Sequence, residues 1–147
     1  MFRELWTERD PRVPIHRQID AEGRPTVEDV AEEIRAHPPT RTGLLAVERR
    51  LSGEVIGYCG LVVQEVNGLD APELAFEFLR RAWGHGYATE ASSAVLNWAR
   101  SSAFSHLWAT VWDWNTASRR VLEKLGFAEI RRETRGPAEI ILARLDL

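Results

Sequence analysis

The stretch RRAWGHGYATEA, residues 80–91, joins a strand-like segment to a helix-like segment through two glycines. Residues 73–78 before it (ELAFEF) form a strand-like run, and apolar residues follow it at helical spacing over 88–103. A helix N-terminus presents unpaired N–H groups, and Gly84 and Gly86 would let an anion approach them closely. The corner therefore predicts a phosphate or pyrophosphate site, with a tight structural turn as the alternative. It is not a P-loop, because no Gly-Lys-Ser/Thr follows, and it lacks the third glycine of the dinucleotide fingerprint.

The remainder of the chain reads as alternating helices and strands without repeats or long linkers. Thr26 is a good helix N-cap, Asn67-Gly68 marks a turn between two strands, and Gly126 is a helix stop. We expect one domain over residues 1–147, of the α/β class (α+β type) with a mixed sheet. The expected helices are 1–9, 27–36, 88–103 and 115–126, and the expected strands are 43–50, 55–66, 73–78, 106–112, 128–134 and 139–145.

Composition excludes several functional classes. The 147 residues are 44% hydrophobic and carry a net charge of −3, which argues against a nucleic-acid binder that relies on bulk positive charge. No run approaches the length of a membrane span, and the first ten residues are charged where a signal peptide is apolar. A cytoplasmic protein without nucleic-acid or membrane partners is expected. Cys59 is the single cysteine, and no Cys/His cluster has zinc spacing, so we expect no metal.

Two motifs carry a resemblance to a known family. WGHGYATEA (83–91) resembles the acyl-CoA-binding motif of the GNAT superfamily of acetyltransferases, with Trp83 in place of the usual Gln or Arg. NTASRRVLEKLGF (115–127) is similar to a second helix of the same family, at the right distance downstream. The likeness is greatest to the ribosomal-protein N-terminal acetyltransferase (Rim-type) group. It runs from about Leu44 to the C-terminus.

The resemblance implies a fold and a cofactor site. The fold would be a mainly antiparallel twisted sheet with a central pair of splayed parallel strands and helices on both faces. The family's first strand has no counterpart here, and a dimer partner or the N-terminal segment could cover the edge that its absence exposes. Acetyl-CoA would lie in the splay. Backbone pairing of pantetheine is expected at Phe78 and Leu79, pyrophosphate binding at Trp83, Gly84, His85, Gly86, Tyr87 and Ala88, and further cofactor contacts at Asn115 and Ser118. Arg80, Arg81 and His85 could add positive charge beside the corner.

Acetyl transfer to an amine needs a base for the amine and an acid for the departing thiol. The family's tyrosine acid is replaced by Leu122, so the resemblance offers Ser118 as the catalytic acid; a serine bonded to its own helix backbone is the alternative. Glu73 and Glu77 point to the same face of one strand. We favour Glu73 as the base, against the alternative of a solvated acidic strand face. Cys59 is expected to be an inert buried thiol.

The expected function is an N-acetyltransferase that moves the acetyl group of acetyl-CoA directly to a primary amine in a ternary complex. The acceptor could be a small molecule or a protein N-terminus. The alternative is a non-catalytic, regulatory acyl-CoA-binding module, which the missing tyrosine keeps open. A relative that shares only the fold, with a glycine corner that binds nothing, is a third interpretation.

Overall fold

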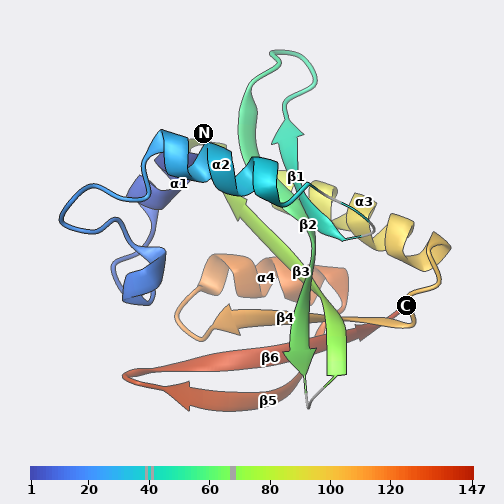
Figure 1. Cartoon of the computed structure of the whole chain (residues 1–147). Coiled ribbons are helices and arrows are strands. Elements are labelled where there is room, and N and C mark those ends of the chain that lie inside the picture. The colour runs from blue at the N-terminus through green and yellow to red at the C-terminus, as the bar shows by residue number, and fades with distance from the viewer. Residues whose placement is uncertain (39, 41, 67–68) are drawn as a thin grey trace.

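Six strands and four α-helices build the chain, in a computed structural model that describes residues 1–38, 40, 42–66 and 69–147. Figure 1 shows these elements along the chain. Two short 3₁₀ turns, Ile15–Arg17 and Arg80–Ala82, complete the order. The α-helices are α1 (Phe2–Glu8), α2 (Val27–Ala36), α3 (Tyr87–Ser101) and α4 (Thr116–Leu125); the strands are β1 (Gly43–Glu48), β2 (Val55–Val66), β3 (Leu69–Phe78), β4 (His106–Trp112), β5 (Ala128–Arg135) and β6 (Ala138–Asp146).

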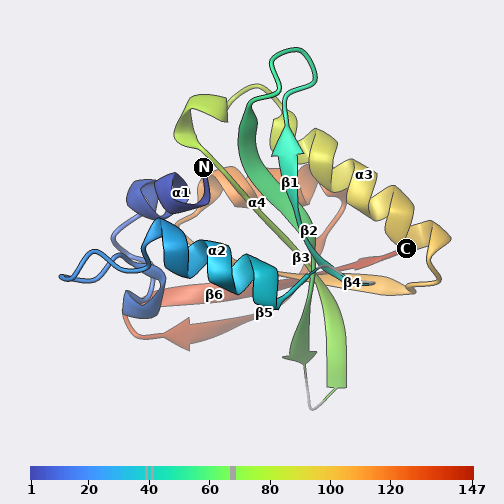
Figure 2. The same cartoon turned by 45° about the horizontal axis from the view of Figure 1, so that its top comes forward.

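The strands form one sheet in the order β1-β2-β3-β4-β6-β5. All neighbours are antiparallel except β3 and β4, which are parallel and share a single register pair, Glu73 with Trp108. Beyond this pair the two strands separate, and Figures 1 and 2 show them crossing once and then diverging. The expected mixed sheet with a central pair of splayed parallel strands is therefore confirmed.

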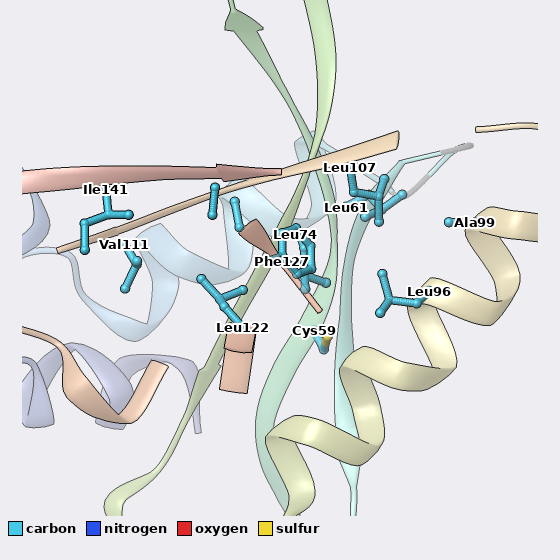
Figure 3. Close-up of a cluster of buried hydrophobic side chains, with 12 residues drawn as sticks. Cys59, Leu61, Leu74, Leu96, Ala99, Leu107, Val111, Leu122, Phe127 and Ile141 are labelled. Carbon is cyan, nitrogen blue, oxygen red and sulfur yellow. The ribbon is translucent and has the colours of Figure 1, made fainter. Parts of the chain in front are cut away.

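The helices cover the two faces of the sheet, as the strand alternation requires. Tyr58 of β2 packs against Leu5 of α1, whereas the next residue, Cys59, lies in the main core with Leu96 of α3. Figure 3 shows that core, in which residues of α3 face β2 and Leu122 of α4 faces the same interior. The sheet therefore has an α1 face and an α3/α4 face, and this division decides what each side of the splay can bind.

Local capping signals account for the helix ends. Thr26 and Asp29 form the expected capping box, in which the Asp29 N–H donates to Thr26 Oγ1 and the Thr26 N–H donates to the Asp29 carboxylate. Gly126 ends α4 in the left-handed conformation, as predicted. The amphipathic spacing of α2 identified a helix, but none of its residues is buried and Val27 is 61% exposed.

Other boundaries moved by a few residues. β3 begins at Leu69 rather than at residue 73, because it pairs with β2 along its whole length. The Asn67-Gly68 turn lies outside the described residues. In the ranges that the structure describes, no strand precedes β1, which therefore forms one edge of the sheet. None of the helices in those ranges combines the length and apolar character needed to cross a bilayer.

Candidate active site

A cleft of about 1860 Å³ occupies the region where β3 and β4 separate. Its walls come from the splayed strands, the glycine corner, the exposed face of α4 and the loop that follows α1. Eight of the ten predicted cofactor residues line it, namely Phe78, Trp83, Gly84, Gly86, Tyr87, Ala88, Asn115 and Ser118. Leu79 and His85 do not line it. One concave site thus collects residues from Leu5 to Leu142 of the sequence.

The glycine corner is shaped for a bulky anion. Gly84 and Gly86 have φ of 79° and 83°, a left-handed conformation that L side chains rarely adopt. A Cβ atom at either position would meet no heavy atom within 4 Å, so both glycines border open space. Gly86 is the N-cap of the 15-residue helix α3, and no side chain caps its free N–H groups. These features fit the pyrophosphate of an acyl-CoA.

Along β3, the backbone N–H and carbonyl groups of every second residue face β2, and those of the residues between them face the splay. The Leu79 N–H donates to the Ile56 carbonyl of β2 at 2.9 Å, and the Leu79 side chain is fully buried. Leu79 therefore points its N–H away from the cleft, so the pantetheine pairing expected there does not have this group available. Strand alternation instead turns the backbone groups of Phe76 and Phe78 toward the splay. The Phe78 carbonyl already accepts a hydrogen bond from Trp83 Nε1 at 2.8 Å, which fixes the indole against the strand end.

The structure separates the three groups expected to add positive charge at the corner: Arg80 lines the cleft, whereas Arg81 and His85 border a different, small hollow. Arg80 donates to the Glu8 carbonyl, and Arg81 forms ion pairs with Glu4 and Glu54, so both guanidinium groups serve to attach α1 and the β1–β2 turn. The His85 ring stacks on Tyr87 and borders a separate small hollow.

Two cations from α4 line the cleft, Arg120 and Lys124. Sequence reasoning missed this pair. Their i, i+4 spacing, which places them on one helix face, was the available signal.

Asn115 and Ser118 lie together at the start of α4. Asn115 is the N-cap, and its Oδ1 accepts a hydrogen bond from the Ser118 N–H at 3.1 Å. The Ser118 hydroxyl makes no hydrogen bond within the described chain, although Ser93 and Ser101 bond their own helix backbones as the alternative interpretation supposes. The hydroxyl that borders the cleft is therefore free to serve a ligand.

Glu73 stands at the point where the strands separate. Its side chain is only 4% exposed, and its Oε1 accepts hydrogen bonds from the N–H and hydroxyl of Thr110 on β4. In the described residues Oε2 is buried without a partner. Burial raises the pKa of the carboxyl, and Thr110 and the charge of Arg17 offset only part of that rise. One oxygen is thus bound to Thr110 on β4, and the other has no hydrogen-bond donor among the described residues.

Glu77, the second carboxylate on this face, is held differently. Arg9 donates to both of its oxygens, at 2.8 and 2.7 Å, and Tyr58 donates its hydroxyl at 2.7 Å. Burial tends to raise the pKa of Glu77, but these partners outweigh it and the pKa lies below its ordinary value. Burial together with the Glu77 charge raises the pKa of Tyr58, which keeps the hydroxyl a neutral donor. Glu77 is therefore a fixed anion and a poor base.

The loop after α1 spans the open end of the splay. Arg9 binds Glu77 on β3, and the Arg12 guanidinium lies 4.2 Å from the centre of the Trp114 ring, directly after β4. We call residues 9–17 the bridging loop. Pro11 and Pro14 identified these residues as a loop, but no local signal showed that the loop closes one side of the cleft.

Arg9→Met is expected to destabilise the fold by about 3 kcal/mol, because it leaves the charge of the partly buried Glu77 without its cation. Urea unfolding followed by circular dichroism measures this loss. Glu77 has a lowered pKa in the folded state, so it stabilises the wild type above its unfolded pKa, and this contribution is lost as the pH falls. The free energy of unfolding of Arg9→Met should therefore decrease less in acid than that of the wild type.

Arg12→Met is the matched control. Arg12 lies on the same loop and covers the Trp114 ring as Arg9 covers the Trp6 ring, but its ion pair with Asp10 is exposed, so only a small change is expected. Equal losses in the two variants would contradict the special role of the Arg9–Glu77 pair.

The sequence model of a family described as the acetyltransferase (GNAT) domain matches residues 2–128. The chain belongs to this GNAT family. The assignment confirms the membership predicted from the glycine corner and from the α4 motif, and with it the prediction of an acyltransferase family. The match also extends to Phe2, well before the region from Leu44 onward that carried the resemblance.

Relatives and solved structures place the GNAT domain in context. The uncharacterized protein YkkB of Bacillus subtilis is 38% identical over 84 residues, covering 56% of this chain and 49% of that protein. The chain spans about half the length of the curated relatives it matches. A GNAT-family acetyltransferase from Bacillus anthracis has the same fold, with a TM-score of 0.75, 21% identity and coverage of 98% of this chain and 86% of that chain.

Two further structures share the fold of this GNAT domain. Ribosomal-protein-alanine N-acetyltransferase from Brucella melitensis gives a TM-score of 0.68 at 20% identity, with 83% of this chain and 79% of that chain covered. YncA from Salmonella typhimurium, a putative acetyltransferase solved with its cofactor acetyl-CoA, gives a TM-score of 0.66 at 18% identity, with 81% of this chain and 72% of that chain covered. The fold predicted by the resemblance to Rim-type enzymes is thereby confirmed.

Proposed function

We propose that this GNAT domain transfers the acetyl group of acetyl-CoA to a primary amine, with both substrates bound in the cleft at once. The observation that carries the proposal is the unpartnered Oε2 of Glu73, buried in the same cleft as the uncapped N-terminus of α3. A proton acceptor on the α1 face and an anion cradle at the opposite end suit a two-substrate reaction. The family assignment and the acetyl-CoA bound to a protein of the same fold support this interpretation.

The proposed cofactor contacts follow from the cleft. Backbone N–H groups between Trp83 and Ala88 hold the pyrophosphate, while Arg120 and Lys124 add positive charge from α4. The backbone edge at Phe76 and Phe78 supplies hydrogen-bonding groups to the amide-rich pantetheine chain. When bound, acetyl-CoA supplies an acetyl thioester whose carbonyl carbon accepts an amine.

The protein's own residues manage the protons. Glu73 Oε2 takes a proton from the acceptor amine, which must be neutral for its nitrogen to form the new bond. The raised pKa of Glu73 makes the carboxylate a stronger base than an exposed glutamate. Ser118 Oγ donates a hydrogen bond to the sulfur as the carbon–sulfur bond breaks, which stabilises the departing thiolate; the nitrogen loses a proton as the amide forms, and this balances the proton that the thiolate takes up to become the thiol. Holding both reactants in the cleft lowers the barrier further through alignment.

Two measurements test the proposal. Thermal shift with acetyl-CoA tests cofactor binding, and thiol release with a panel of amines tests turnover. Tight binding of acetyl-CoA with no turnover of any amine would contradict the enzyme and favour the non-catalytic binding module. A melting temperature that acetyl-CoA does not change would favour the third interpretation, a protein that shares the fold but does not bind the cofactor.

Ser118→Ala is expected to lower kcat about tenfold or more at unchanged melting temperature. The hydroxyl has no partner in the described structure, and the α4 cap uses only the Ser118 backbone N–H, so stability should not change. Asn115→Ala is the contrasting variant, since it removes the cap and should lower the melting temperature. An unchanged kcat in Ser118→Ala would remove the serine from the reaction.

A further inference from the structure

The acceptor side of the cleft contains one cation without a fixed partner, Arg17. Its side chain is exposed and lines the cleft, and in the described part of the chain its guanidinium donates no hydrogen bond and forms no ion pair. Arg9 and Arg12, its neighbours on the bridging loop, are both committed to carboxylates, Glu77 and Asp10. Arg17 is thus the cation of this loop that remains available to a ligand.

The main chain beneath Arg17 is firmly held. Its carbonyl accepts a hydrogen bond from Arg9 Nη1 at 3.1 Å, and its N–H donates to the Pro14 carbonyl at 2.8 Å. The side-chain amide of the next residue, Gln18, donates to the carbonyls of Pro11 and Val13, which closes the loop on itself. The loop therefore presents the Arg17 side chain from a fixed base, which lowers the entropy lost when a ligand binds.

The charge of Arg17 also acts on ionisable groups inside the cleft. Its positive charge acts on three groups of the α1 face, favouring the ionised forms of Glu73, Glu77 and Tyr58. Glu77 is already neutralised by Arg9, so Arg17 and Glu73 remain as a cation and an anion without fixed partners of opposite charge.

A buried donor completes the set. Trp114 lines the cleft, and its indole Nε1–H is buried without an acceptor in the described residues. Glu73 Oε2 is the complementary case, a buried acceptor without a donor. Unsatisfied buried groups cost free energy, so a ligand that supplies an acceptor to one and a donor to the other is favoured.

From this arrangement we infer that the acceptor is an amino-carboxylate, such as a free amino acid, with its amine at Glu73 and its carboxylate at Arg17. The inference rests on the proposed function and specifies its acceptor. An amine with no anionic group would leave Arg17 without a partner. A protein N-terminus, whose first residue is joined to a peptide, likewise carries no carboxylate beside its amine.

Paired substrates test the inference directly. Amino acids that carry a primary amine and no thiol are compared with their carboxamides as acceptors by thiol release at saturating acetyl-CoA, for the wild-type chain and for Arg17→Gln. Each pair keeps its side chain and differs in the carboxylate. The amine of a carboxamide is the less basic of the two and so more often neutral, which means that a preference for the acid runs against intrinsic reactivity.

We expect the wild type to prefer the acid of at least one pair by about tenfold or more in kcat/KM, and Arg17→Gln to remove most of this preference through a higher KM. Arg35→Gln is the charge-matched control, because Arg35 is exposed on α2 and does not line the cleft. It should keep the preference.

The failures are distinguishable. Turnover of acids and carboxamides at equal rates, or a preference that survives in Arg17→Gln, would overturn the amino-carboxylate and leave the acetyltransferase standing. Turnover confined to amines without a carboxylate would do the same. Binding of acetyl-CoA without turnover of any amine would overturn the proposed function, and the acceptor with it.

Discussion

Glu73→Gln is expected to lower kcat for acetyl transfer by about 10²–10⁴-fold while leaving the affinity for acetyl-CoA unchanged. The substitution removes the proton acceptor but retains a carbonyl oxygen that can accept the hydrogen bonds from Thr110. The glycine corner and α4 are untouched. Steady-state thiol release gives kcat, and calorimetric titration gives the affinity for acetyl-CoA.

The pH dependence of the reaction tests the role of Glu73 as the base without relying on the size of the loss in kcat. The wild-type kcat/KM should fall as the pH drops through the raised pKa of Glu73, and this limb should be absent in Glu73→Gln. A folded pKa above the unfolded one means that the buried carboxyl stabilises the fold at low pH and that this contribution is lost as the pH rises. Glu73→Gln should therefore be at least as stable as the wild type at pH 7. Activity within a few fold of wild type would assign the base elsewhere.

Gly86→Asp is expected to weaken acetyl-CoA binding about a hundredfold relative to Gly86→Asn. Both replacements tolerate the left-handed conformation that Gly86 adopts, and both place a side chain of the same size in open space. They differ in one negative charge at the N-terminus of α3, where the pyrophosphate is proposed to lie. The comparison therefore isolates electrostatic repulsion from backbone strain.

Isothermal titration with acetyl-CoA and with plain CoA measures the effect of both Gly86 variants. Thermal unfolding without ligand serves as the control, and the Asp variant should be at least as stable as the Asn variant because an acidic side chain complements a helix N-terminus. Equal affinities of the two variants for acetyl-CoA would remove the corner from the pyrophosphate site.

Much of the fold was accessible from the sequence because its signals are local. β4 spans 106–112 as expected, and α4 lies between an Asn115 cap and a Gly126 stop that are both visible as single residues. The glycine corner was recognised because two left-handed glycines before a helix form a compact pattern. The roles of Glu73 and Ser118 in catalysis remain predictions, although the structure places both in the cleft.

The acceptor side was not accessible, because its contacts join distant parts of the chain. Arg9 and Glu77 are 68 residues apart, and Arg12 contacts Trp114 across an even longer separation in sequence. Residues 10–25 carry only prolines and glycines as local information, which predict a loop and not its position. The register between β2 and β3 likewise decides whether the Leu79 N–H points toward β2 or toward the splay, and the local sequence does not show this register.

The position of Glu73 in the fork has a consequence for how this site can diverge. Its carboxylate accepts a hydrogen bond from the N–H of Thr110, which lies two residues beyond the one register pair that joins β3 and β4. A shorter side chain would release Thr110, and an apolar one would leave that N–H without an acceptor. Sequence change at this position is therefore constrained twice, by architecture and by chemistry. New specificities should arise more readily at the exposed positions of the bridging loop, such as Arg12 and Arg17, where a side chain can be exchanged without breaking the Arg9–Glu77 pair.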